Sequence, residues 1–424
     1  MKGMGLAVAA LIGLAACGST PAAGGGISAP ALGPTDAAIS AEQAALRQNP
    51  ADVPSLEALA GSYLQKVREV GDPSYYAKVE ALLRQALALK PGDVDAETLM
   101  GTLQLARHQF ASALTWGRAA AAQDSFDANA LGVVGDAEVE LGRYDAAADT
   151  FQQMVDTRPD LSSYARVSYL RELHGDVAGA VDAMQMAVTA GGPVPENTAY
   201  TEVLLGNLYF GAGRVDDADL AYHAAISADP GYVQALAGLA QVQAARADWP
   251  AAIRLYRQAI DTYPAPQFVI ALGDAYTAAG DPRQAAQTYD LASAEQQLYE
   301  ANGIDLDMEL ALFDADHARD LPAALAAAQR AVRDRPGIYS YDALAWALFK
   351  SGAASAALQA SRSAHRLGTR DALLYFHTGM IEAALGQRTA AAADLGLALA
   401  INPHFSVLHA GEARTELAQL GGAA

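Results

Sequence analysis

Small apolar residues recur along this chain at a nearly constant interval. Nine alanines are separated by 33 to 39 residues, and each is followed seven residues later by another alanine or, in one case, by Met154. A spacing of seven places both side chains on the same face of a helix. The pattern predicts nine similar helices, whose first marked positions are Ala113, Ala147, Ala180, Ala218, Ala252, Ala285, Ala324, Ala357 and Ala391.

Each repeated unit also carries the marks of a helical hairpin. A large residue followed by a small one stands 12 to 13 residues before the alanine in five units, at Val134-Gly135, Leu205-Gly206, Leu239-Ala240, Leu272-Gly273 and Leu344-Ala345. A proline stands twelve residues after it in five units, at Pro159, Pro230, Pro264, Pro336 and Pro403. The small residue allows two helices to approach closely, and the proline ends the second helix. We therefore expect antiparallel helix pairs joined by tight turns.

The period and its companions resemble a known repeat family. The unit with Leu205-Gly206, Tyr209, Gly213, Ala218, Tyr222, Ala225 and Pro230 resembles the tetratricopeptide repeat (TPR), a helix-turn-helix motif of about 34 residues. The resemblance implies an all-α fold, a right-handed TPR-type α-solenoid of antiparallel helix hairpins. It implies about ten TPR-like repeats over residues 52–405, with a leading half-repeat helix at 36–51 and a C-terminal capping helix and tail at 406–424.

The N-terminus indicates a compartment. Lys2 precedes an apolar stretch that ends in Leu14-Ala15-Ala16-Cys17-Gly18. This resembles the signal peptide and lipobox of bacterial lipoproteins, which implies that residues 1–16 are removed, that Cys17 is lipidated and that 17–35 form a flexible tether. The expected location is the bacterial cell envelope, with a lipid anchor in a membrane, the outer membrane if the host has one. The alternative is an ordinary secretory signal with an incidental cysteine.

Composition and charge narrow the function classes. Hydrophobic residues make up 52% of the 424 residues but aromatic residues only 7%, which favours thin, closely packed helices over a sheet. The net charge of −20 repels phosphate backbones, so nucleic-acid binding is disfavoured. A basic partner is compatible with this charge, although acidity also serves solubility alone. The single cysteine excludes an intrachain disulfide and a multi-thiolate metal site.

The resemblance also places a candidate binding groove. In such solenoids the first helix of each unit lines the inner groove, and in the last three units these positions combine aromatic and acidic residues. The candidate groove residues are Glu309, Phe313, Tyr339, Asp342, Trp346 and Phe376. Aromatic anchors beside carboxylates suit a peptide with apolar side chains and a basic residue. The alternative is that the aromatic residues pack between neighbouring helices and that the acids are solvated.

No catalytic motif accompanies these features. The sequence has no phosphate-binding loop, no dinucleotide fingerprint and no nucleophile elbow, so we expect neither an enzyme nor a cofactor or metal. We expect a non-enzymatic, envelope-anchored scaffold that binds proteins or peptides in its concave groove and supports assembly of a cell-envelope complex. The alternative function is a receptor for a glycan, a peptidoglycan fragment or another small ligand in the aromatic and acidic groove of the last three repeats.

Overall fold

The computed structural model describes residues 33–192 and 194–421. Within these ranges the chain forms 22 α-helices and no β-strand, which confirms the predicted all-α fold. The helices are α1 (Pro34–Gln48), α2 (Val53–Val70), α3 (Tyr75–Leu89), α4 (Val94–Ala106), α5 (Phe110–Gln123), α6 (Ala128–Glu140), α7 (Tyr144–Thr157), α8 (Leu161–Leu173), α9 (Val177–Ala190), α10 (Pro195–Gly211), α11 (Val215–Ala228), α12 (Val233–Ala245), α13 (Trp249–Thr262), α14 (Pro266–Ala278), α15 (Pro282–Ala301), α16 (Asp307–Asp316), α17 (Leu321–Asp334), α18 (Ile338–Lys350), α19 (Ala354–Ala364), α20 (Ala372–Ala384), α21 (Arg388–Ile401) and α22 (His409–Gly421).

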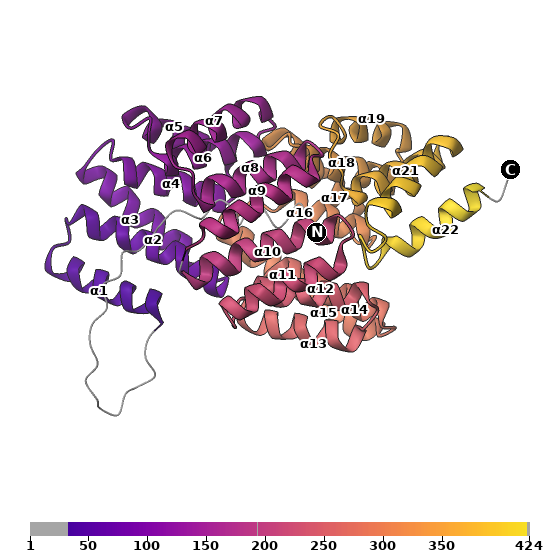
Figure 1. The fold of residues 1–424 in the computed structure, drawn as a ribbon, viewed down its shortest axis with the longest axis horizontal. Helices are drawn as coiled ribbons and strands as arrows, with labels where there is room; N and C mark the ends of the chain where they lie inside the picture. The colour runs from indigo at the N-terminus through magenta and orange to yellow at the C-terminus, as the bar shows by residue number, and fades with distance from the viewer. Residues whose placement is uncertain (1–32, 193, 422–424) are drawn as a thin grey trace.

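Consecutive helices from α2 to α21 pair into ten hairpins, with α1 before them and α22 after them (Figure 1). The nine alanines singled out by their spacing all lie on the second helix of a hairpin, and all are buried. Their small side chains let the second helix lie close to its neighbours. The sequence pattern therefore identified a packing surface.

The large-small pairs sit where the two helices of a hairpin cross. A Cβ atom added to Gly135 would lie 2.2 Å from the ring of Phe151, and one added to Gly206 would lie 2.5 Å from the ring of Tyr222. No larger side chain fits at these positions unless the aromatic ring moves. The second helix of the hairpin thus fills the space that the small residue leaves.

Aspartates begin many of the helices. Asp52, Asp93, Asp127 and Asp160 accept backbone N–H groups at the first turns of α2, α4, α6 and α8. These N-caps satisfy donors that have no partner inside the helix and place a negative charge at the positive end of its dipole. Part of the acidic excess of the chain therefore has a structural role.

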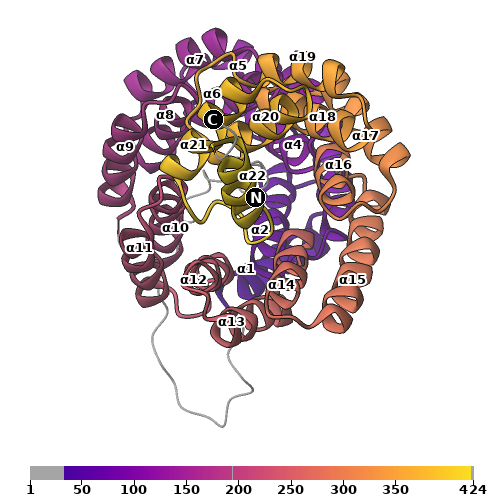
Figure 2. The ribbon, with the colours of Figure 1, turned by 90° about the vertical axis from the view of Figure 1, so that its right-hand side faces the viewer.

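The hairpins wind into a superhelix. Figure 2 shows the first helices of the hairpins, among them α10, α12, α14 and α16, as an inner ring, and the second helices, among them α9, α11, α13 and α17, outside them. Among the described residues, no helix is both long enough and apolar enough to span a membrane. The predicted signal peptide, Cys17 and nearly all of the predicted tether lie outside the described residues.

The second turn of the superhelix lies directly on the first. The backbone N–H of Asp305, before α16, donates to the carbonyl of Arg107, after α4, at 3.0 Å. The same relation recurs one hairpin further on, where Ile338 at the start of α18 meets Tyr144 at the start of α7. Partners in these contacts are 192 to 198 residues apart, and their helices are six hairpins apart. One superhelical turn therefore takes six hairpins.

Contacts between the turns continue along the next two hairpins. The Thr369 hydroxyl, before α20, donates to the carbonyl of Leu173 at the end of α8. The Asn402 amide, before α22, donates to the carbonyl of Phe210 in α10 at 2.8 Å. Because Thr369 and Asn402 are both buried, these hydrogen bonds are shielded from water. They fix the register of the second turn on the first.

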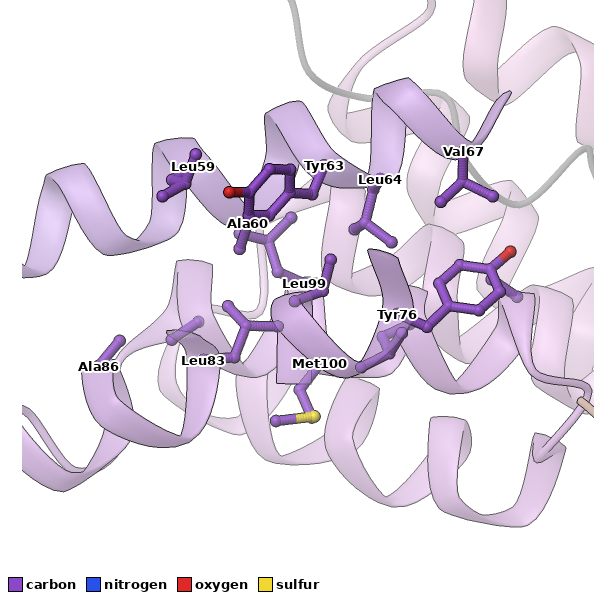
Figure 3. Packing of buried hydrophobic residues seen from close by; sticks show 14 of the residues in the cluster. Leu59, Ala60, Tyr63, Leu64, Val67, Tyr76, Leu83, Ala86, Leu99 and Met100 are labelled. Atoms are coloured by element: carbon purple, nitrogen blue, oxygen red, sulfur yellow. The ribbon is translucent and has the colours of Figure 1, made fainter. Parts of the chain in front are cut away.

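Apolar packing also crosses between the turns. Figure 3 shows the core between α2, α3 and α4, in which Leu59, Leu83 and Met100 are buried. The same cluster includes Ile304 and Leu306, which precede α16. The core is therefore continuous from the first turn into the second.

Candidate functional site

The two predicted groove acids are buried and paired. Glu309 in α16 accepts a hydrogen bond from Arg335 at 2.6 Å, and the side chains of both residues are less than 5% exposed. Asp342 in α18 lies 2.9 Å from Nδ1 of His377 in α20, and both of these side chains are also buried. Burial alone would raise the pKa of Glu309, but the charges of Arg335 and His108 lower it below its ordinary value. Pairing therefore explains how both carboxylates exist inside the array.

Three of the predicted groove aromatics are buried in ring clusters. Phe313 in α16 packs against Tyr289 and His317, and Phe376 in α20 packs against Phe405. The third aromatic, Trp346, is fully buried. These contacts agree with the alternative that the aromatic residues pack between neighbouring helices.

Trp346 is the centre of its ring cluster. The indole of Trp346 stacks on the ring of His377 with centroids 4.1 Å apart, and its Nε1 donates to Asp316 at 2.7 Å. The ring of His409 in α22 meets the same indole edge-on and also bonds to Asp316. The cluster therefore holds the C-terminal helix against α16 and α18.

Tyr339 is the one partly exposed member of the six predicted residues. It packs with Tyr169 and Leu170 of α8, in the first turn of the superhelix. Burial raises the pKa of its hydroxyl well above the ordinary value, and the charge of Asp371 adds to this effect. The binding role of all six residues stays a prediction.

Partly exposed carboxylates without an ion pair occur elsewhere on the inner helices. Glu140 ends α6 and Glu202 lies in α10, and among the described residues neither side chain forms a hydrogen bond or an ion pair. Burial, together with the charges of Glu309 and Asp136, raises the pKa of Glu140 to about 7, although the charge of Arg335 lowers it. Burial also raises the pKa of Glu202. The sequence pattern does not single out these two acids, because the partial burial of Glu140 depends on residues of the second turn.

A cavity of about 80 Å³ opens where the two turns meet. Its lining includes Tyr76 of α3, His108 after α4, Gln296 and Tyr299 of α15, and Glu309 of α16. The Nε2 of Gln296 is buried there without a hydrogen-bond partner. A volume of this size holds a few water molecules, not a peptide. The inner helices are therefore the better candidate surface for a macromolecular partner.

Two groups of three acids come close together. Burial raises the pKa of Glu57 to about 8, so that its carboxyl group is protonated at neutral pH beside Asp93 and Asp95. A protonated carboxyl group donates to the Asp93 carboxylate, which explains this group without a metal ion. The second group consists of Asp305, Asp307 and Asp334.

Basic side chains satisfy that second group. Arg330 makes two hydrogen bonds to Asp307, and Arg333 lies against Asp334. Local charge therefore accounts for this arrangement as well. The expectation that the protein holds no metal stays a prediction.

Comparison with known sequences decides the nature of the units. The family model described as tetratricopeptide repeat matches residues 98–162, 134–195, 203–265 and 243–297. Residues 98–195 and 203–297 therefore contain tetratricopeptide repeats. The TPR matches span α5 to α14 almost without a gap, and hairpins of the same design lie on both sides of them. The comparison with curated proteins gives no significant match.

Solved TPR structures are similar at low sequence identity. The chain is 14% identical to a chain of the APC/C hetero-tetramer Cut9–Hcn1, with 91% of this chain and 93% of that chain covered and a TM-score of 0.40. It is 21% identical to TTC0263, a thermophilic TPR protein of Thermus thermophilus, with 37% and 84% covered and a TM-score of 0.35. It is 19% identical to YrrB, described as a TPR protein with an unusual peptide-binding site, with 45% and 95% covered and a TM-score of 0.29.

TPR domains generally bind proteins or peptides and are generally non-catalytic. The repeats thus suggest a protein-interaction scaffold, as the sequence analysis expected. Extended repeat arrays offer a long surface for such contacts.

Proposed function

We propose that this protein is an envelope-anchored, non-enzymatic TPR scaffold that binds a basic protein or peptide segment along its inner helices. The observation that carries the proposal is the pair of unpaired, partly buried carboxylates Glu140 and Glu202 on the inner helices. Support for a scaffold in assembly of an envelope complex comes from the TPR array together with the lipobox-like sequence before Cys17.

Burial raises the pKa of both carboxyl groups. A carboxylate whose pKa is raised by burial is less stable in its charged form than one in water. A lysine or arginine side chain placed beside it favours the charged form again and gains a charge-assisted hydrogen bond. The inner helices therefore favour a cationic partner over a neutral one of the same shape.

Peptide binding tests this proposal directly. Fluorescence anisotropy would compare peptides containing Lys or Arg with the same peptides carrying Gln at those positions. We expect the basic peptides to bind more tightly, and the double variant Glu140→Gln with Glu202→Gln to lose about tenfold in affinity, or about 1.4 kcal/mol.

The matched control removes the same charge from the outer helices. Asp149 of α7 and Asp182 of α9 are exposed, and Asp149→Asn with Asp182→Asn changes the net charge by the same amount. We expect this double variant to bind like the wild type. Equal losses in the two double variants would mean that only the overall charge matters, and the proposed inner surface would be wrong.

Salt separates the two candidate functions. Binding of a basic peptide weakens as ionic strength rises, because the charges are screened. Binding of a neutral glycan that depends on neither salt nor Glu140 and Glu202 would favour the alternative role of a glycan or peptidoglycan receptor.

The membrane anchor has its own test. If Cys17 carries the lipid, Cys17→Ala moves the protein from the membrane fraction to the soluble fraction. An unchanged membrane fraction would contradict the anchor and leave the peptide-binding proposal standing.

A further inference from the structure

The superhelix has two free edges. Their loops are equivalent to the loops that form the contact between its first and second turns. We call the loops before α2, α4, α6, α8 and α10 the N-terminal edge, and the loops after α12, α14, α16, α18 and α20 the C-terminal edge. Equivalent loops form the contact between the turns, where the loops after α4, α6, α8 and α10 meet those before α16, α18, α20 and α22. In Figure 1 the first turn lies to the left and the second to the right, so the free edges are at opposite ends of the array.

The turns on the C-terminal edge have the same backbone shape as those already in contact. Gly142 and Gly175 adopt left-handed φ values of 69° and 76°, and a Cβ added to either would lie within 2.6 Å of a carbonyl oxygen of the second turn. Gly280, Gly352 and Gly386 adopt φ values of 80°, 83° and 73°, and a Cβ added to any of them would meet no described atom within 4 Å. The same docking shape is therefore present on this edge without a partner.

The N-terminal edge exposes apolar side chains where the inner contact buries them. Ile304 precedes α16 and Ile338 begins α18, which are both inner helices of the second turn. The two side chains are 5% and 1% exposed because the first turn covers them. Phe126, before α6, is 74% exposed, and Val194, before α10, is 48% exposed. A copy docked on this edge would cover both side chains.

We propose that a second copy of this chain docks its N-terminal edge on the C-terminal edge of the first, and so continues the superhelix head to tail. The contact is an extension of the one that already joins the two turns of a single chain. Because the two docking surfaces are different, each copy keeps one free edge, and the assembly grows as an open row of copies.

Charge sets the conditions for this association. Asp124 and Asp127 flank Phe126 on the N-terminal edge. Arg319 lies in the loop after α16 on the C-terminal edge, and Lys350 ends α18, directly before another loop of that edge. The C-terminal edge also carries Asp248, Asp281 and Asp320 in its loops, and Arg319 is already paired with Asp290, so its local charge is mixed. The net charge of −20 on each copy still opposes association, so the contact should strengthen as added salt screens this repulsion.

Sedimentation velocity of the purified full chain at increasing concentration tests the proposal. We expect the 43.9 kDa monomer to give way to dimers and longer species by about 100 μM, more completely at high than at low salt. Phe126→Asp on the N-terminal edge and Ala279→Arg on the C-terminal edge should each leave a monomer. Leu220→Asp is the matched control, because Leu220 is 71% exposed on the outer helix α11, away from both edges.

Mixing the two edge variants distinguishes head-to-tail docking from a symmetric dimer. Phe126→Asp keeps its C-terminal edge and Ala279→Arg keeps its N-terminal edge, so an equimolar mixture should form dimers and nothing longer. A wild type that stays monomeric at every salt concentration would overturn the proposal. So would an edge variant that associates like the wild type, or a mixture that stays monomeric while each variant remains folded by circular dichroism.

Discussion

The hydroxyl oxygen of Tyr144 accepts the backbone N–H of Ile338 at 2.9 Å and joins two residues that are 194 positions apart. Tyr144 begins the outer helix α7 in the first turn, and Ile338 begins the inner helix α18 in the second. Both residues are buried, so water cannot replace the bond without opening the contact between the turns. Side chains as well as the backbone therefore hold the second turn of the superhelix against the first.

Tyr144→Phe removes this acceptor and leaves the Ile338 N–H buried without a partner. We expect the free energy of unfolding in urea to fall by about 1–3 kcal/mol. Tyr209→Phe is the control, since the Tyr209 hydroxyl accepts only an exposed hydrogen bond, from Gln185. Equal effects of the two substitutions would mean that the Tyr144 hydroxyl does not stabilise the contact between the turns.

Two glycine substitutions should have opposite signs. Gly206→Ala places a methyl group 2.5 Å from the ring of Tyr222, and overpacking of this kind typically costs about 1–3 kcal/mol. Gly396 lies within α21 and has open space around its Cβ position, so Gly396→Ala should stabilise the protein by about 0.5–1 kcal/mol. Thermal unfolding measures both, and a stabilising Gly206→Ala would refute the close crossing of α10 and α11.

The buried pair of Glu309 and Arg335 should show strong coupling. Glu309→Leu or Arg335→Met alone leaves an uncompensated buried charge, and we expect a loss of about 3–5 kcal/mol for each. The double variant should lose much less than the sum. A double-mutant cycle by urea unfolding measures the difference, and additive losses would show that the two side chains do not interact in solution.

Docking of the C-terminal helix should depend on pH. Burial lowers the pKa of His409, but hydrogen bonds to Asp316 and Glu412 outweigh burial and raise it to about 9. A group whose pKa is raised by folding stabilises the protein fully below its ordinary value of about 6.5, and this stabilisation is lost as pH rises through 9. We therefore expect α22 to be better protected from hydrogen exchange at about pH 6.5 than at about pH 9.5, after correction for the intrinsic exchange rates.

The control for this pH effect is His409→Gln, which cannot titrate. The variant should remove most of the difference in α22 protection between the two pH values. If α22 of the wild type is equally protected at both, the ion pair of His409 with Asp316 does not hold the helix in place.

The sequence predicted where the candidate residues lie but not how deeply they are buried. The repeat period placed Glu309, Asp342 and Trp346 on inner helices, and the structure has them there. Their burial follows from Arg335, His377 and the stacked rings, which come from other helices. Periodicity gives the face of a helix on which a residue lies, but the depth of that face depends on what packs over it.

The sequence by itself determined the hairpin. Alanines seven residues apart, glycines such as Gly206 at the helix crossing and aspartates such as Asp93 at helix starts are local requirements, and each is satisfied within one or two repeats. Only the tertiary structure showed that one superhelical turn takes six hairpins and that Tyr144 and Ile338 join the first turn to the second. The rotation between neighbouring hairpins accumulates over nearly 200 residues, and no local pattern records where the chain meets itself again.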